Sequence, residues 1–337
     1  MNEQLPPPVQ MFNLITGFWI SCCIYNAAKL NIADLLAEGS KTPAQLAEKT
    51  SSDPSSLYRV LRALASAGIF TENDQGQFAN TMLSETLKSD IPGSMKAMAI
   101  AQLGDHYNAW GNLSYSIKTG GIAFNDVEGM NVWEYYQSHP EESINFMKAM
   151  TGMSKASVMN VLPAYDFSAF KTLVDVGGGN GALLMGILEA SNEATGIVFD
   201  TGNVIEETKK AILARGFDSR CKAEAGDFFV SVPAGADAYL MKMVLHDWTD
   251  EQSVSILKNC AKAMNADSKL LVIESVIPEG NAPHPGKLLD INMMAMTGGK
   301  ERTEKEFRIL LSQAGLELTR IVYTHSPLFS IMEAVKN

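Results

Sequence analysis

Short apolar runs alternate with amphipathic stretches in the second half of the chain. Runs that suit β-strands cover residues 172–176, 196–200, 220–225, 237–243, 269–275, 316–324 and 328–335. Helical periodicity covers residues 181–190, 203–215, 250–264 and 303–314. Capping boxes at residues 249–252 and 303–306 mark the starts of two of these helices. Strands that alternate with helices favour a parallel sheet with crossover connections, so we expect an α/β domain over residues 165–337.

The first part of the chain has the pattern of short helices followed by a hairpin. Thr42-Pro43 and Asp53-Pro54 each place a capping residue before a proline at the first helical position. Apolar residues then share one face of the second helix, at Leu57, Val60, Leu61 and Leu64. A strand begins at Ile69-Phe70 and is followed by a polar turn. Helix, turn, helix and hairpin in this order predict a winged-helix-like domain over residues 1–100.

Two further segments are expected to be helical. Residues 94–162 carry unusual amounts of Met, Trp and Tyr. Residues 11–36 form the most apolar long segment, but polar side chains interrupt it, so we interpret it as a buried helix or helix pair and not as a membrane span. The first basic residue is Lys29, so a secretory signal is not expected.

Charge and cysteine content narrow the class of protein. The 337-residue chain has a net charge of −11, which disfavours nucleic acid and anionic membranes as partners. Its four cysteines form neither a disulfide framework nor the spacing of a zinc site, so no metal is expected and a reducing cytoplasm fits. We expect DNA binding to be absent despite the winged-helix pattern, because the candidate recognition helix offers only Arg59 and Arg62.

A glycine-rich turn follows the first strand of the α/β domain. Residues 173–181 read LVDVGGGNG, an apolar strand that runs into a turn and then a helix. Glycine lets the backbone adopt positive φ and approach a ligand closely. Gly177, Gly179 and Ala182 also satisfy the dinucleotide fingerprint G-x-G-x-x-A, so this turn alone does not identify the cofactor.

Acidic residues at three strand ends help to distinguish a dinucleotide from a sulfonium compound as the cofactor. Asp175 ends the first strand and could bind an ammonium group, Asp200 ends the second and suits a ribose diol, and Asp227 follows the third and could accept from an adenine amino group. Three acids around one crevice favour a cationic sulfonium cofactor, S-adenosyl-L-methionine, over an anionic dinucleotide.

One histidine lies where a catalytic base is expected. His246 directly follows a buried strand and precedes a capped helix, at the carboxyl edge of the sheet. It could act as a general base or make a structural hydrogen bond. Glu274, at the end of the next strand, and Glu301 could each accept the other imidazole N–H and stabilise the imidazolium. Alternatively, Glu301 could form a salt bridge with Lys300 or Arg302.

These motifs together resemble those of the plant-type small-molecule O-methyltransferase family, which includes caffeate, hydroxyindole and bacterial polyketide methyltransferases. The matching segments are residues 173–181, 226–227, 241–248, 271–274 and 298–307, in order along the chain. Two positions depart from the family pattern, because Thr201-Gly202 follows Asp200 where Leu-Pro is usual, and Phe228 stands where methionine is frequent. Both departures keep the ribose acid and an apolar wall for adenine.

The resemblance implies a role for each site residue. The catalytic residues would be the base His246 and its flanking acids Glu274 and Glu301. Cofactor contacts would fall on Gly177, Asp200, Asp227, Phe228, Lys242, Ser154 and Trp248. The substrate pocket would include Met150, Met153, Trp110, Met293 and Met296, with Met294, His106 and Tyr107 as further candidates. These methionines and aromatic residues suit an aromatic or polycyclic guest but could equally be core.

The expected protein is an O-methyltransferase with a Rossmann-like catalytic domain. The resemblance makes residues 1–100 a dimerisation domain in a homodimer, with the apolar stretch 12–24 as the surface that dimerisation would bury. It makes residues 101–164 a helical linker that contributes to the pocket. It makes residues 165–337 the domain that binds S-adenosyl-L-methionine and methylates a hydroxyl of a small molecule. Three alternatives remain: an N-methyltransferase, a cofactor-binding relative with hydroxylase or decarboxylase activity, and a winged-helix ligand sensor.

Overall fold

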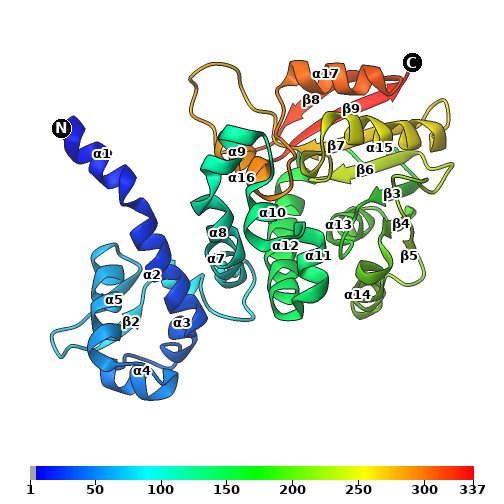
Figure 1. Ribbon diagram of the computed structural model, residues 1–337. Helices are drawn as coiled ribbons and strands as arrows, with labels where there is room; N and C mark the ends of the chain where they lie inside the picture. Colours follow the sequence, from blue (N-terminus) through cyan, green and yellow to red (C-terminus); the bar gives the residue numbers. More distant parts are fainter. Residues whose placement is uncertain (1–4) are drawn as a thin grey trace. The chain divides into compact units, whose positions relative to one another are not determined.

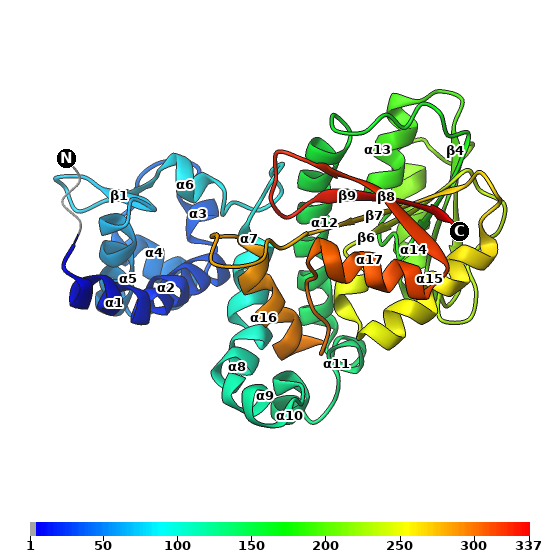
Figure 2. The ribbon, with the colours of Figure 1, turned by 90° about the horizontal axis from the view of Figure 1, so that it is seen from above.

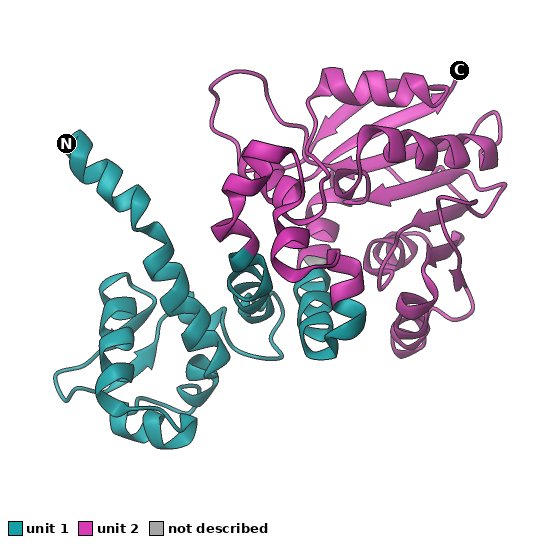
Figure 3. Ribbon diagram, in the orientation of Figure 1, with its two compact units in different colours: residues 1–108, 136–152 teal, residues 109–135, 153–337 magenta. Residues whose placement is uncertain are grey.

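The computed structural model describes residues 5–337, with the side chains of residues 155 and 156 left aside. The chain divides into two compact units, coloured separately in Figure 3. The first comprises the chain up to residue 108 together with residues 136–152, and the second comprises residues 109–135 and 153–337. Each unit has a hydrophobic core of its own.

The first unit is mostly helical, as its sequence predicts. Its elements are α1 (Pro7–Ile15), α2 (Gly17–Lys29), α3 (Ile32–Leu35), α4 (Pro43–Thr50), α5 (Pro54–Ser66), β1 (Phe70–Glu72), β2 (Phe78–Asn80), α6 (Met82–Glu85) and α7 (Lys96–Leu103). Thr42 and Asp53 cap α4 and α5 as predicted. Leu57, Leu61 and Leu64 are buried on one face of α5. Strands β1 and β2 pair antiparallel and form the predicted hairpin.

Within one chain, residues 11–36 are buried only in part. They form the helix pair α1 and α2, but α1 has no buried residue and α2 buries only Ala27 and Ala28. Pro7–Lys29 is long and apolar enough to cross a membrane by length and composition. A single stretch of this kind near the N-terminus is weak evidence for a membrane span, because other apolar helices pass the same test.

Three helices contain residues of both units, namely α8 (Asp105–Gly111), α11 (Val132–Ser138) and α12 (Pro140–Val161). The second unit adds two short helices, α9 (Leu113–Thr119) and α10 (Ala123–Glu128), and a seven-stranded sheet. The strands are β3 (Thr172–Val176), β4 (Thr195–Asp200), β5 (Cys221–Ala225), β6 (Ala238–Lys242), β7 (Lys269–Glu274), β8 (Leu316–Tyr323) and β9 (Ser330–Lys336).

The sheet has the doubly wound arrangement that the alternating pattern predicts. Its strand order is β5-β4-β3-β6-β7-β9-β8. The first five strands in that order are parallel, whereas β9 pairs antiparallel with both β7 and β8. Because β4 and β6 lie on opposite sides of β3, the order of the strands reverses beside β3, which is where ligands bind in such folds.

Helices cover both faces of this sheet (Figures 1 and 2). One core joins the sheet to α15 (Asp250–Ala263) and α17 (Glu304–Gln313), through residues such as Ile256 and Phe307. The other joins it to α13 (Ala182–Ala190) and α14 (Gly202–Ala214), through residues such as Leu184 and Ile212. One helix of this unit, α16 (Gly286–Met296), is not predicted from the sequence. This three-layer packing leaves the carboxyl ends of the strands as the edge that carries the site.

Candidate active site

The segment that carries His246 leaves strand β6 by a sharp turn. Met243 has a φ of 52°, in the left-handed region that non-glycine residues rarely adopt. Residues Leu245–Asp247 then form a single turn of 3₁₀-helix, η1. The turn places His246 at the carboxyl edge of the sheet with only 5% of its surface exposed. Backbone strain of this kind concentrates at functional sites.

His246 and Glu301 form a buried pair. The Nδ1 atom of His246 lies 2.7 Å from Oε1 of Glu301, whose residue is 2% exposed. The short distance fits an N–H on Nδ1 that donates to the carboxylate, which leaves Nε2 as the basic ring nitrogen. Nε2 lies 3.9 Å from Oδ1 of Asp247, too far for a hydrogen bond. The pair thus has the geometry of an oriented general base.

Glu274 serves the backbone of the loop and not the imidazole. Its Oε1 accepts the N–H groups of Val244 at 3.0 Å, Leu245 at 2.7 Å and His246 at 3.3 Å. The sequence left both acids open as partners of the ring, and the structure assigns that contact to Glu301. Glu274 instead holds the turn from which the histidine projects, and a carboxylate that accepts several N–H groups is a strong anchor.

The charges around His246 raise its pKa. Burial alone lowers the pKa of the imidazole, but the carboxylates of Asp247, Glu301 and Glu274 outweigh burial and raise it to about 9. Burial raises the pKa of Asp247 to about 6, although His246 opposes this shift. Burial also raises the pKa of Glu274. The carboxylates therefore stabilise the imidazolium that proton abstraction by His246 would produce.

The glycine-rich turn lies against the same loop. Gly177 has a φ of 67°, and a Cβ built on it would lie 2.7 Å from Cγ2 of Val244, so only glycine fits there. Asp200 accepts the N–H of Gly179 at 2.9 Å through Oδ2 and that of Thr201 at 2.7 Å through Oδ1. These two hydrogen bonds hold the half-buried Asp200 beside the turn.

Asp175 does not present its carboxylate at the ligand-facing side of the turn, contrary to the role expected for it. It is 1% exposed, and its side chain lies beneath Gly178, where an added Cβ would come within 2.8 Å of Cγ of Asp175. Burial raises its pKa to about 7, an effect that the charge of Lys242 opposes. Its Oδ2 has no hydrogen-bond partner in the described structure.

Aromatic side chains gather beside the loop. The Trp248 ring lies 6.0 Å from that of Phe228 and 4.9 Å from that of Phe229, in edge-to-face arrangements. Trp133, which the sequence did not single out, stacks on Trp248 with ring centres 6.4 Å apart. Asp227 is exposed and accepts the N–H of Phe229 at 2.8 Å. The cluster combines apolar faces with a nearby carboxylate, as an adenine site requires.

The remaining predicted cofactor residues lie on two elements. Lys242 ends strand β6, and burial lowers its pKa while the charges of Asp175 and Glu274 oppose that shift. Ser154 lies in α12, where its carbonyl accepts from Ser157 Oγ at 2.7 Å. Both belong to the second unit, together with His246.

The predicted substrate residues divide between the two units. Trp110, Met153, Met293 and Met296 belong to the second unit, whereas Met150, His106 and Tyr107 belong to the first. Trp110 donates its Nε1–H to Oδ1 of Asn292 at 2.8 Å, which joins α8 to α16. Met293 and Met296 are buried on α16. His106 Nε2 lies 3.3 Å from the hydroxyl of Tyr136 within the first unit.

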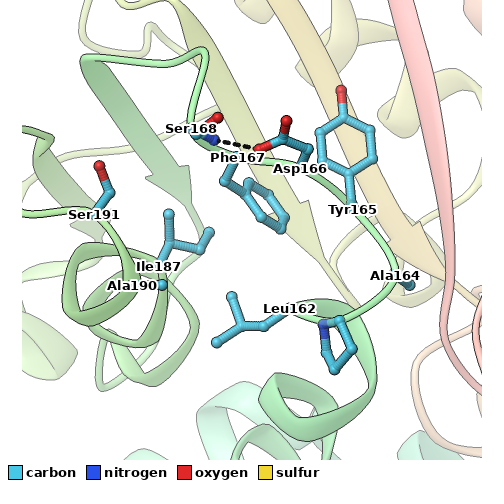
Figure 4. Close-up of a pocket in the computed structure, with 10 residues that line it drawn as sticks. Leu162, Ala164, Tyr165, Asp166, Phe167, Ser168, Ile187, Ala190 and Ser191 are labelled. Atoms are coloured by element: carbon cyan, nitrogen blue, oxygen red, sulfur yellow. Dashed lines mark hydrogen bonds between the residues drawn. The ribbon is translucent and has the colours of Figure 1, made fainter.

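Two hollows in the second unit include none of these residues. One, of about 350 Å³, is lined by residues of the segment 162–168 and by Ile187, Ala190 and Ser191 (Figure 4). It lies where the chain enters β3 and leaves α13, at the amino edge of the sheet. The other, of about 700 Å³, is lined by residues of the loop after β7, the start of α17 and the β8–β9 hairpin. Neither hollow is lined by His246 or Glu301.

Three residues near the base were missed as site residues by reasoning from sequence. The sequence indicates Arg302 only as a salt-bridge partner of Glu301 and Gly299 only as part of a matching motif, and it gives no indication of Asp290. Arg302 is fully buried, and Asp290 accepts the N–H of Glu301 at 2.9 Å. The one available signal is sequence proximity, because Arg302 follows Glu301 directly and Gly299 precedes it by two residues.

Two family models match the chain. The O-methyltransferase domain matches residues 110–317, and the O-methyltransferase dimerisation domain matches residues 12–90.

Curated relatives match nearly the full length. Phenazine O-methyltransferase PhzM of Lysobacter antibioticus is 43% identical over 96% of this chain and 95% of its own. Mitomycin biosynthesis 6-O-methyltransferase of Streptomyces lavendulae is 37% identical over 91% and 88%. 8-Amino-8-demethylriboflavin N,N-dimethyltransferase of Streptomyces davaonensis is 34% identical over 90% and 88%.

Solved structures agree with the fold. That of LaPhzM has a TM-score of 0.96 at 42% identity and covers 99% of this chain and all of its own. That of NcsB1, in complex with S-adenosyl-L-homocysteine and 1,4-dihydroxy-2-naphthoic acid, has a TM-score of 0.83 at 32% identity and covers 94% and 96%. The predictions of the fold, of an O-methyltransferase and of its cofactor are confirmed. The chain belongs to the family of S-adenosyl-L-methionine-dependent O-methyltransferases that carry an N-terminal dimerisation domain.

Proposed function

We propose that this enzyme methylates a hydroxyl group on a small polycyclic aromatic molecule, with His246 as the general base. The observation that carries the proposal is the buried pair of His246 and Glu301 at the carboxyl edge of the sheet. A hydroxyl needs to lose its proton as it attacks a methyl group, and an oriented imidazole supplies the acceptor.

The residues have distinct parts in this reaction. Nε2 of His246 takes the hydroxyl proton while Nδ1–H remains bonded to Glu301, so the positive charge forms beside a carboxylate. Glu274 keeps the loop in place through the three N–H groups it accepts. S-adenosyl-L-methionine supplies the methyl group, which bonds to the substrate oxygen as its bond to sulfur breaks. General-base catalysis contributes about 10²–10⁴-fold to such a step.

The cofactor site is built from the residues around the glycine-rich turn. We assign Gly177 and Asp200 to the ribose and methionine side, and Phe228 and Trp248, with Asp227, to the adenine. Lys242 and Ser154 complete the set. The distances among Gly179, Asp200 and Thr201 and the aromatic cluster support this assignment.

The substrate class rests on the lining residues and on the relatives. The proposed substrate residues of the second unit are Trp110, Met153, Met293 and Met296. Adaptable methionine side chains suit a flat apolar guest. The relatives named for phenazine and mitomycin, and the structure with a bound dihydroxynaphthoic acid, support a polycyclic phenol.

The chain is proposed to act as a cytoplasmic homodimer. Large apolar residues are exposed along α1 and the start of α2, at Val9, Met11, Phe12, Leu14, Ile15, Phe18 and Trp19. Such a surface is unusual on a monomer, and it overlaps the match to the dimerisation domain. Residues 1–100 would then serve dimerisation, 101–164 would link this part to the pocket, and 165–337 would carry the cofactor.

An N-methyltransferase is the second candidate, because one relative is an N,N-dimethyltransferase. Product mass separates the two when polycyclic phenols and their matched amines are incubated with S-adenosyl-L-methionine. We expect phenols to gain one methyl group, and His246→Asn to lose this activity by about 10²–10⁴-fold. Near-native turnover of phenols by His246→Asn would refute the base, and methylation of the amines alone would establish the second candidate.

A further inference from the structure

The segment that carries Glu301 is held between two other parts of the second unit. The N–H of Glu301 donates to Oδ1 of Asp290 in α16 at 2.9 Å. On the next residue, the carbonyl of Arg302 accepts the N–H of Ile277 at 3.0 Å. Hydrogen bonds on consecutive residues fix the backbone of this segment relative to α16 and to the chain after β7.

The side chain of Arg302 binds the loop that carries His246. Its Nη1 donates to the carbonyl of Leu245 at 3.0 Å, and its Nη2 donates to the carbonyl of Trp248 at 3.0 Å. These two carbonyls stand on either side of His246 in the sequence. Nη2 also donates to Ser253 Oγ at 3.2 Å, and Nε donates to Oδ1 of Asp250 at 2.9 Å. One guanidinium therefore spans the whole turn.

Gly299 brings the two backbones into contact. A Cβ built on Gly299 would meet the carbonyl oxygen of His246 and would lie 2.6 Å from the carbonyl carbon of Asp247. Neither neighbour is a flexible side chain, so any larger residue would push the segment away from the loop. The close approach places Glu301 within reach of the imidazole.

We propose that Arg302 and Gly299 form a lock that sets the distance between Glu301 and His246. The inference rests on the proposed function of that pair. Arg302 is fully buried and contacts protein groups on every side, so it is a positioning residue. A lysine keeps the charge but cannot donate to Leu245, Trp248 and Asp250 at once, because it lacks the planar fork.

The main test is Arg302→Lys, with Arg308→Lys as the matched control. Arg308 lies in α17, six residues after Arg302, where it binds Glu304 and the carbonyl of Leu318 away from the loop. We expect Arg302→Lys to bind S-adenosyl-L-homocysteine as the native enzyme does in calorimetry, but to lose kcat by about 10²-fold, as a misplacement near 1 Å can cause. The control should keep native values of both.

The pH profile distinguishes positioning from stability. The carboxylates that face His246 are Glu301, Asp247 and Glu274, and the lock controls only the first of them directly. When Glu301 moves away, the pKa of His246 falls. The rise of kcat/KM with pH, the acid limb of the profile, should therefore occur at lower pH in Arg302→Lys than in the native enzyme. A substitution that merely lowered the amount of folded enzyme would reduce the rate without moving the limb.

Gly299→Ala provides a second, independent variant. It should fold, keep cofactor affinity and show the same loss of kcat and the same shift of the limb. If both variants fold and keep the native kcat and the native pH profile, Arg302 and Gly299 do not set the distance between Glu301 and His246. The role of His246 as the base would still stand in that case, provided that His246→Asn loses activity. If circular dichroism shows that both variants are unfolded, Arg302 and Gly299 contribute to stability and the proposed positioning role is wrong. An active His246→Asn would instead refute the proposed function itself.

Discussion

Glu301→Gln is the sharpest test of how the carboxylate acts on His246. The amide oxygen can still accept the Nδ1–H at the 2.7 Å separation, so orientation is kept and only the charge is removed. A hydrogen bond to a charged group contributes ~1.5–3 kcal/mol and one between neutral groups ~0.5–1.5 kcal/mol, so removing the charge alone costs ~1–1.5 kcal/mol. This cost corresponds to roughly one pKa unit, at ~1.36 kcal/mol per unit.

The sign of the effect follows from the raised pKa of His246. The pKa of His246 is raised to about 9, so at lower pH the imidazole is mostly protonated and cannot act as a base. We therefore expect kcat/KM to rise with pH through that value. Without the charge of Glu301 the pKa falls, and the limb moves to lower pH. The plateau at high pH should drop by ~5–13-fold, because the imidazolium that forms in the reaction loses the charge that stabilises it.

The assay measures kcat/KM from pH 6 to pH 10 with two phenols of different acidity, since an ionising substrate can produce a similar limb. His246→Asn, in which the limb should be absent, serves as the control. A limb and plateau in Glu301→Gln that both match those of the native enzyme would show that the carboxylate does not stabilise the charged imidazole. In that case the 2.7 Å contact would be structural.

Three further outcomes are expected. Asp200→Ala should weaken cofactor binding by ~1.5–3 kcal/mol in calorimetry, because a ribose diol would lose a charged acceptor; unchanged affinity would place the ribose elsewhere. Replacing Phe12 and Trp19 together by serine should turn a dimer into a monomer or an aggregate in light scattering, and a native-like dimer would contradict the interface proposed for α1 and α2. Glu333 is bonded to Tyr165, Lys269 and Arg320, and although its burial opposes the shift, these partners lower its pKa to about 2 from an ordinary 4.5. The native protein should therefore lose stability as pH falls from about 4.5 towards 2, and Glu333→Gln should lack that part of the slope in thermal melts.

The sheet could be predicted closely because its strands are continuous apolar runs. Residues 172–176 match β3 in both bounds, and the remaining strands differ by two residues or fewer at each end. Helix α16 was missed because no capping side chain marks its start at Pro285-Gly286. Apolar content alone does not show whether this chain or another copy covers residues 12–24, and only the family resemblance favours another copy.

The site could be predicted only as far as strand ends determine it. Parallel strands bring His246 and Glu274 to one edge, so their proximity follows from topology. Which acid binds the imidazole depends on the path of the segment after α16, and that path depends on the contacts of Gly299 and Arg302. The stacking of Trp133 on Trp248 joins residues that are far apart in the chain, and no periodic pattern indicates such a contact.

The two outer strands of the sheet bear on how the enzyme avoids aggregation. An outer strand has unpaired backbone groups that can recruit another chain. Here β5 is short and exposes Lys222 and Glu224, and β8 exposes Glu317 and Arg320 and has an irregular register between Leu318 and Arg320. Charges and a break in register both oppose strand-to-strand growth. A concentrated solution of the enzyme should therefore resist forming fibres through this sheet, and substitutions that make β5 apolar would remove that protection.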